Sequence, residues 1–178
     1  MQEVKLTGTL REDTGTKSAK ATRKEGLIPC VLYGGKNGNI HFTLHPNDVK
    51  HIVFTREFKT ASIDIDGKEY RCIVKDLQFH PVTDAIHHID FLALHEGVKI
   101  KTQIPLRCVG TAPGTKEGGK MIQKIRAVDI KTTPQHLVDE LTVSVADLAI
   151  GVTKRIRDID VPEHIQILNA PNIPVAIA

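Results

Sequence analysis

The stretch that decides the fold runs from residue 62 to residue 94 and reads SIDIDGKEYRCIVKDLQFHPVTDAIHHIDFLAL. Apolar and polar residues alternate before Asp66-Gly67, a dipeptide typical of the type I′ turn in a tight β-hairpin. A loop at 81–84 precedes a third alternating segment. The pattern therefore predicts three successive strands, over residues 62–65, 68–78 and 86–94.

More strands are predicted on the N-terminal side of this stretch. Residues 4–10 and 40–44 alternate apolar with polar, and 28–33 is a short apolar run closed by two glycines. Residues 46–53 fit a short helix with Pro46 in its first turn. The first half of the chain is thus expected to be β-rich with short helices.

The second half shows the same β-rich pattern. Val98, Ile100, Ile104 and Leu106 would share one face of a strand, and residues 110–119 read as a long flexible loop. Further short strands are predicted around 127–132, 141–145, 153–156, 165–168 and 175–178. The predicted fold class is mainly β with short helices, as a sandwich or barrel, in two domains, 1–96 and 97–178.

Composition excludes several classes of protein. The 178 residues are 40% hydrophobic and 25% charged, with a formal charge of +3, which is typical of globular proteins. No apolar run is long enough to cross a membrane, and the N-terminus lacks the apolar core of a secretion signal, so a cytoplasmic location is expected. Cys30, Cys72 and Cys108 form no close pair, which favours free thiols over disulfides or a metal motif.

Positive charge is concentrated in one short segment of the first half. Residues 1–96 contain 13 basic and 13 acidic residues, yet residues 16–24 (TKSAKATRK) contain four cations and no anion. On a helix, Lys17, Lys20 and Lys24 would share one side with Arg23 alongside. Such a helix is short and carries Lys17 near the positive end of its dipole, so a bound polyanion would stabilise it. A solvated cationic face is the alternative.

Strand parity defines a second candidate surface. In 86–94, His88 and Asp90 point to one side, and Ile89 and Phe91 point to the other as candidate core. If the strand at 68–78 pairs back across the loop, one register puts Gln78 opposite His88. Glutamine, histidine and aspartate together offer donors and acceptors that can read base edges. An ordinary solvated outer face is the alternative.

Two single residues complete the candidate RNA-binding set. Tyr33 ends an apolar strand beside two glycines, which would leave its ring free to lie against a base or ribose; a partly buried core position is equally compatible. Arg11 follows the first predicted strand and could brace a phosphate or remain solvated.

Histidines and acids at 80–95 raise a competing hypothesis, a metal-dependent enzyme. His80, His87, His88 and His95, with Asp84 and Asp90, match no HExxH or zinc-finger spacing. The chain also lacks a P-loop, a GxGxxG fingerprint and a GxSxG elbow, so no cofactor, metal or small-molecule substrate is predicted. A third hypothesis is a protein-interaction module that uses the second domain as its surface.

Several segments together resemble one family. They are Leu10-Arg11, residues 15–23, 28–34, 76–81 and 88–91, in the order and spacing of the bacterial family of large ribosomal subunit protein twenty-five, also known by the general stress protein Ctc. Residues 109–114, 118–119, 145–148 and 150–151 resemble the appended β domain of its long form. The resemblance covers nearly the whole chain.

The resemblance implies a non-catalytic ribosomal protein with a small N-terminal β-barrel, which binds 5S ribosomal RNA around loop E alongside other large-subunit components. Carried over by motif, the RNA-binding residues would be Arg11, Lys20, Arg23, Tyr33, Gln78, His88 and Asp90. The family often has arginine where this chain has Ala21 and Phe79. Lys17 is expected to compensate for Ala21, although lysine lacks the bidentate fork of arginine.

Overall fold

The computed structural model describes residues 2–35 and 38–178. The chain divides into two compact units, Met1–His95 and Glu96–Ala178. Most regular structure in both units is β, so the predicted fold class is confirmed. None of the described helices is long and apolar enough to cross a bilayer.

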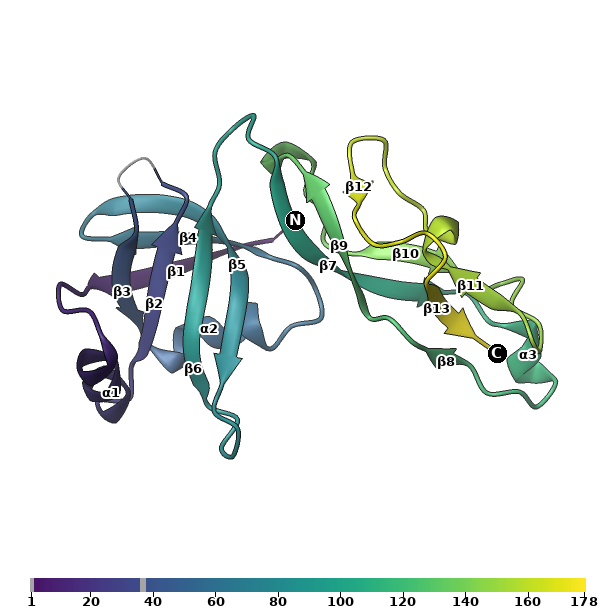
Figure 1. Ribbon diagram of the computed structural model, residues 1–178, viewed down its shortest axis with the longest axis horizontal. Helices are drawn as coiled ribbons and strands as arrows, with labels where there is room; N and C mark the ends of the chain where they lie inside the picture. The colour runs from purple at the N-terminus through teal and green to yellow at the C-terminus, as the bar shows by residue number, and fades with distance from the viewer. Residues whose placement is uncertain (1, 36–37) are drawn as a thin grey trace. The chain divides into compact units, whose positions relative to one another are not determined.

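The first unit is a closed barrel of six strands in the order β1-β3-β2-β6-β5-β4 (Figure 1). Adjacent strands pair antiparallel except β1 with β4 and β2 with β6, which are parallel. The strands are β1 (Glu3–Leu10), β2 (Ile28–Tyr33), β3 (Ile40–Leu44), β4 (Thr60–Ile65), β5 (Lys68–Phe79) and β6 (Ile86–Ala93), and the helices are α1 (Thr16–Lys24) and α2 (Pro46–Val53).

The hairpin predicted at Asp66-Gly67 is present between β4 and β5. Asp66 and Gly67 have φ angles of 51° and 76°, and both must be positive in a type I′ turn. The Gly67 amide donates to Oδ1 of Asp64 at 2.9 Å, which holds the turn. This turn sets the register that carries β5 back along β4 and then against β6.

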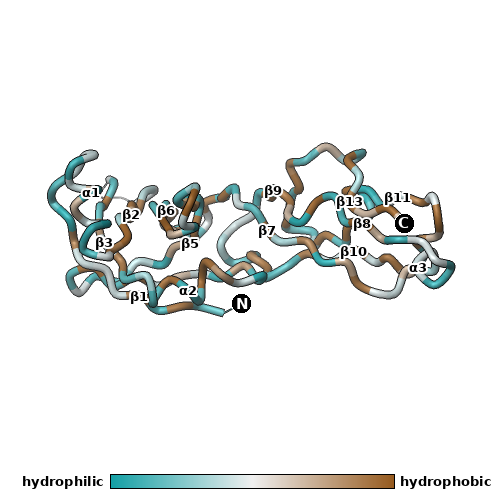
Figure 2. The backbone as a smooth tube through the Cα atoms, turned by 90° about the horizontal axis from the view of Figure 1, so that it is seen from below, coloured by the Kyte–Doolittle hydropathy of each residue, from teal (hydrophilic) through white to brown (hydrophobic). Residues whose placement is uncertain are grey.

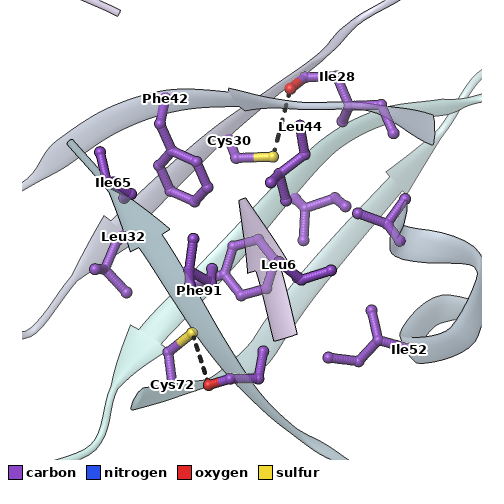
Figure 3. Packing of buried hydrophobic residues seen from close by; sticks show 14 of the residues in the cluster. Leu6, Ile28, Cys30, Leu32, Phe42, Leu44, Ile52, Ile65, Cys72 and Phe91 are labelled. Atoms are coloured by element: carbon purple, nitrogen blue, oxygen red, sulfur yellow. Dashed lines mark hydrogen bonds between the residues drawn. The ribbon is translucent and has the colours of Figure 1, made fainter. Parts of the chain in front are cut away.

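Aliphatic side chains and two phenylalanines fill the barrel (Figure 3). The rings of Phe42 and Phe91 are fully buried with centroids 5.8 Å apart. The thiols of Cys30 and Cys72 donate to the Ile28 and Ala61 carbonyls, and burial raises the pKa of both thiols far above the ordinary value. All three cysteines are free, and these two act as small core residues. Hydrophobic and hydrophilic residues are interspersed along the backbone of each unit (Figure 2).

The second unit contains two small sheets. One has the strand order β10-β7-β9-β12 and the other β11-β13-β8. The strands are β7 (Ile100–Val109), β8 (Ile122–Gln123), β9 (Ala127–Thr132), β10 (Leu141–Ser144), β11 (Thr153–Arg155), β12 (Gln166–Ile167) and β13 (Pro174–Ile177); the short helices are α3 (Pro113–Lys116), η1 (Pro134–His136) and η2 (Ile156–Asp158). Ile104 on β7 and Val128 and Ile130 on β9 are fully buried.

Two predictions for this unit are wrong. Val98 is 53% exposed and precedes β7, so it does not share the buried face of Ile100. Residues 110–119 contain helix α3 in place of a flexible loop. The Gly114 amide donates to the Leu148 carbonyl, and a Cβ at Gly114 would lie 2.9 Å from the Ile150 nitrogen. A close contact with a segment more than thirty residues away therefore orders this turn.

Candidate nucleic-acid interface

The cationic segment forms helix α1, as predicted. The helix begins after Gly15 with no side-chain cap and no acidic residue in its first turn. Its hydroxyl-bearing Thr22 faces inward, whereas Lys17, Lys20 and Lys24 are exposed. The positive end of the helix dipole therefore lies beside uncompensated positive charge, which favours a bound anion.

Arg23 connects α1 to the barrel. Its Nε donates to the carbonyl oxygen of His87 at 3.0 Å, so the end of the helix is held against the start of β6. Burial and the neighbouring Arg11 guanidinium lower the pKa of Arg23 from its ordinary value. The Nε bond leaves the two terminal nitrogens of Arg23 as the groups that can approach a phosphate.

Arg11 is half-buried and not fully solvated. Its backbone amide extends the pairing of β1 with β3 by donating to the His41 carbonyl at 2.9 Å. Its Nε and Nη1 atoms are shielded from solvent and have no hydrogen-bond partner. The guanidinium groups of Arg11 and Arg23 lie near one another, and Nε of Arg23 bonds to a neutral carbonyl oxygen, which does not offset their positive charges. Because Nε and Nη1 are shielded, a phosphate at the surface would act on the charge of Arg11, where it would reduce the repulsion between the two guanidinium groups.

The predicted polar face exists on β5 and β6. Gln78 lies directly opposite His88, which confirms the predicted register. Ile89 and Phe91 are fully buried, whereas the side chains of His88 and Asp90 are 24% and 30% exposed. The predicted division of β6 into a buried face and a partly exposed face is therefore also confirmed.

His88 and Asp90 form a close pair on this face. Nδ1 of His88 lies 2.7 Å from Oδ1 of Asp90, a distance at which Nδ1 carries the hydrogen and donates it. Nε2 of the ring is left to meet a partner, as an acceptor when the ring is neutral. Asp90 thus orients the ring, and its carboxylate is directed at the imidazole N–H.

Tyr33 and Asp76 adjoin the same pair. Burial raises the pKa of Tyr33, and the carboxylates of Asp90 and Asp76 raise it further. The phenol therefore stays protonated as a hydrogen-bond donor. Sequence reasoning did not select Asp76. This residue lies opposite Asp90 in the same strand pairing that puts Gln78 opposite His88.

The histidines at 80–95 do not form a metal centre. Nδ1 of His80 accepts the backbone amides of Val82 and Thr83, and Nε2 of His95 lies 2.6 Å from the Gly34 carbonyl oxygen. The His88 ring is held by Asp90. Across residues 2–35 and 38–178, no three histidine, cysteine, aspartate or glutamate side chains gather as a metal would require.

The eight candidate residues thus occupy two adjoining regions. Lys17, Lys20, Arg23 and Arg11 belong to the cationic region, and Tyr33, Gln78, His88 and Asp90 belong to the polar face. The bond from Arg23 to the His87 carbonyl joins the two regions next to His88. Sequence reasoning missed the role of His87, because a backbone acceptor has no side-chain signature.

Comparison with known proteins identifies the family of both units. Residues 6–91 match the model of the ribosomal L25p family, and residues 99–178 match that of the ribosomal protein TL5 C-terminal domain. Large ribosomal subunit protein bL25 of Cytophaga hutchinsonii is 34% identical over 175 residues, covering 98% of this chain and 90% of that protein. The bL25 of Porphyromonas gingivalis is 36% identical over 176 residues, with 98% and 91% covered. The chain belongs to the ribosomal L25p family.

Membership of the L25p family confirms the prediction that the chain is a ribosomal protein. The L25p proteins are ribosomal structural proteins, so the chain is a ribosomal component and not an enzyme, which removes the metal-dependent hypothesis. The bL25 of Azobacteroides pseudotrichonymphae, 35% identical over 176 residues, extends the similarity to 99% of this chain. Both units of this L25p protein are therefore matched.

Proposed function

We propose that the first unit binds 5S ribosomal RNA at its irregular internal loop, loop E, within the large ribosomal subunit of which this L25p protein is a structural constituent. The bond between Arg23 and the His87 carbonyl carries the proposal, because it places a helix rich in cations directly beside a partly exposed polar strand face.

Each region has a different task in this proposal. Cations contact phosphates and so determine position without reading sequence. Lys17 and Lys20 contribute point charges from the exposed side of α1. Arg23 can present its two terminal nitrogens as a planar pair of donors to one phosphate, and the charge of Arg11 adds to the attraction. The position of Arg11 near Arg23 supports this assignment, because two adjacent positive charges attract a phosphate more strongly than one.

The polar face adds contacts that depend on the shape and bases of the RNA. Gln78 offers a donor and an acceptor, Nε2 of His88 is free, and the protonated hydroxyl of Tyr33 can donate to a base or ribose. Asp90 chiefly orients His88 and can also accept from a base amine or a 2′-hydroxyl. A regular A-form helix hides its major groove, so such a surface suits an irregular loop of non-canonical pairs.

A substitution on the polar face tests the proposal. Gln78→Ala is expected to weaken binding to 5S ribosomal RNA and to reduce the preference for this RNA over a plain RNA duplex. Gln103→Ala, an exposed glutamine on β7 of the second unit, is the matched control and should leave both affinities unchanged. Equal losses of Gln78→Ala on both RNAs would show that Gln78 does not read the loop.

A further inference from the structure

The first unit contains a pocket that the interface above does not use. Its volume is about 400 Å³, within the range of ligand-binding pockets, and it lies between the end of α1, helix α2 and the loop that joins β5 to β6. Its walls are largely apolar and include Leu27, Ile28, Pro46 and Ile86. Arg23 and His87, which join the two regions of the candidate interface, also line it.

An exposed aromatic side chain forms one wall. Phe54 is 64% exposed at the end of α2, and its ring centroid lies 6.3 Å from that of Phe79, which is 44% exposed. The two ring planes are tilted by 48°, so a flat aromatic group would stack on Phe54, the ring that lines the pocket, with Phe79 beside it.

Charge at the pocket is mainly positive. Five titratable residues line it: Arg23, Lys50, His80, Asp84 and His87. Burial lowers the pKa of His87, and Arg23, His80 and His88 lower it further, so His87 is neutral at neutral pH. His80 accepts two backbone amides through Nδ1, so its Nε2 carries the hydrogen and is a donor. The charged groups that line the pocket are therefore two cations, Arg23 and Lys50, and one carboxylate, Asp84.

We propose that this pocket receives one unstacked nucleobase of the bound RNA, with the base stacked on Phe54 and its flanking phosphates near Arg23 and Lys50. The inference rests on the proposed function and deepens it. A nucleotide combines a flat, largely apolar group with negative charge, which matches apolar walls beside two cations. An uncharged apolar peptide would fill the walls but would leave the two charges of Arg23 and Lys50 balanced only by the carboxylate of Asp84.

A mononucleotide tests the pocket independently of 5S binding. Adenosine monophosphate is titrated into the full-length ¹⁵N-labelled protein, with ribose 5-phosphate as the probe that lacks a base. The nucleotide should shift the amide resonances of Phe54, Thr83 and Ile86, and the sugar phosphate should not. Phe54→Ala should abolish the shifts and Phe54→Tyr should retain them. Identical shifts with both probes, or none with the nucleotide in the millimolar range, would overturn the proposal.

The same variants are then measured with 5S ribosomal RNA. Phe54→Ala should weaken binding roughly 5- to 150-fold, the share of one stacked base, without changing the dependence of affinity on salt. Phe54→Tyr and the control Val98→Ala, an exposed residue of the second unit, should bind like the native chain. Unchanged binding of Phe54→Ala would refute the pocket's role. Failure of the native chain to bind 5S RNA would instead refute the proposed function, while the mononucleotide titration would still report on the pocket.

Discussion

Replacing Arg11 with methionine should stabilise the free protein and weaken its binding to RNA. Arg11 is half-buried, with Nε and Nη1 shielded from solvent and unpaired, and it lies near the cationic Arg23. Methionine keeps much of the apolar stem of arginine and removes both the unpaired donors and the charge. A residue retained only for stability would show the opposite effect.

The structure sets the expected magnitudes. An unpaired buried donor costs roughly 1–3 kcal/mol, and since Arg11 is only half-buried we expect Arg11→Met to raise the free energy of unfolding by about 1 kcal/mol. For a unit of this size that corresponds to a melting temperature higher by roughly 4–8 °C. Loss of one charge-assisted contact with phosphate costs about 1.5–3 kcal/mol, so affinity for RNA should fall roughly 10- to 150-fold.

Tyrosine fluorescence during urea unfolding isolates the relevant unit. The chain has two tyrosines and no tryptophan, and Tyr33 and Tyr70 both lie in the first unit. The RNA affinity is measured at several salt concentrations, where loss of one phosphate contact should reduce the logarithmic salt slope by about 0.7–0.9.

Arg71→Met provides the matched control for Arg11→Met. Arg71 is 61% exposed and pairs with Glu3 at 3.5 Å, an exposed ion pair that contributes about 0–1 kcal/mol. Its replacement should change neither the salt slope nor the unfolding free energy by more than that. A less stable Arg11→Met variant with native RNA affinity would refute the reasoning and make Arg11 a structural residue.

Three further substitutions follow from the same geometry. Arg23→Ala should reduce the salt slope of RNA binding by about one phosphate's share, and an unchanged slope in a salt titration would remove Arg23 from the phosphate contacts. Gly8→Ala should destabilise the barrel by about 1–3 kcal/mol, because the new Cβ would lie 2.7 Å from Phe42 Cδ2. In urea unfolding, the loss of stability should be smaller when Phe42→Leu is also present, whereas additive losses would argue against this clash. Burial and nearby cations lower the pKa of His87 below its ordinary 6.5. The unfolded state therefore binds more protons, and the free energy of unfolding falls as the pH drops below about 6.5. His87→Gln should flatten this pH dependence, and an unchanged profile would exclude His87 as its source.

Local patterns in the sequence were sufficient to predict the strands of the barrel. Alternation and the Asp66-Gly67 turn locate β4, β5 and β6, and the Gln78–His88 register follows once the loop at 81–84 is treated as a turn. Closure of the barrel depends on the parallel pairs β1–β4 and β2–β6, which join strands far apart in the chain. Alternation alone does not distinguish such a barrel from a sandwich, since each strand buries one face in either fold.

The candidate site was predictable only in part, for a similar reason. Residue types identified the cations of α1 and the polar residues of β6, because charge spacing and strand parity are local properties. The contact between Arg23 and the His87 carbonyl joins residues 64 positions apart and uses a backbone acceptor. The pocket beside Phe54 likewise depends on three segments that meet only in the folded barrel.

Binding of the full-length protein to 5S ribosomal RNA, compared with the same RNA in which a Watson–Crick duplex replaces loop E, tests the central claim most directly. Titrations over a range of salt concentrations should show tight, salt-dependent binding to the intact RNA and a much lower affinity for the altered RNA, close to that for a plain duplex. Equal affinities for the two RNAs would contradict the claim that the cationic helix and the polar strand face together recognise the irregular loop.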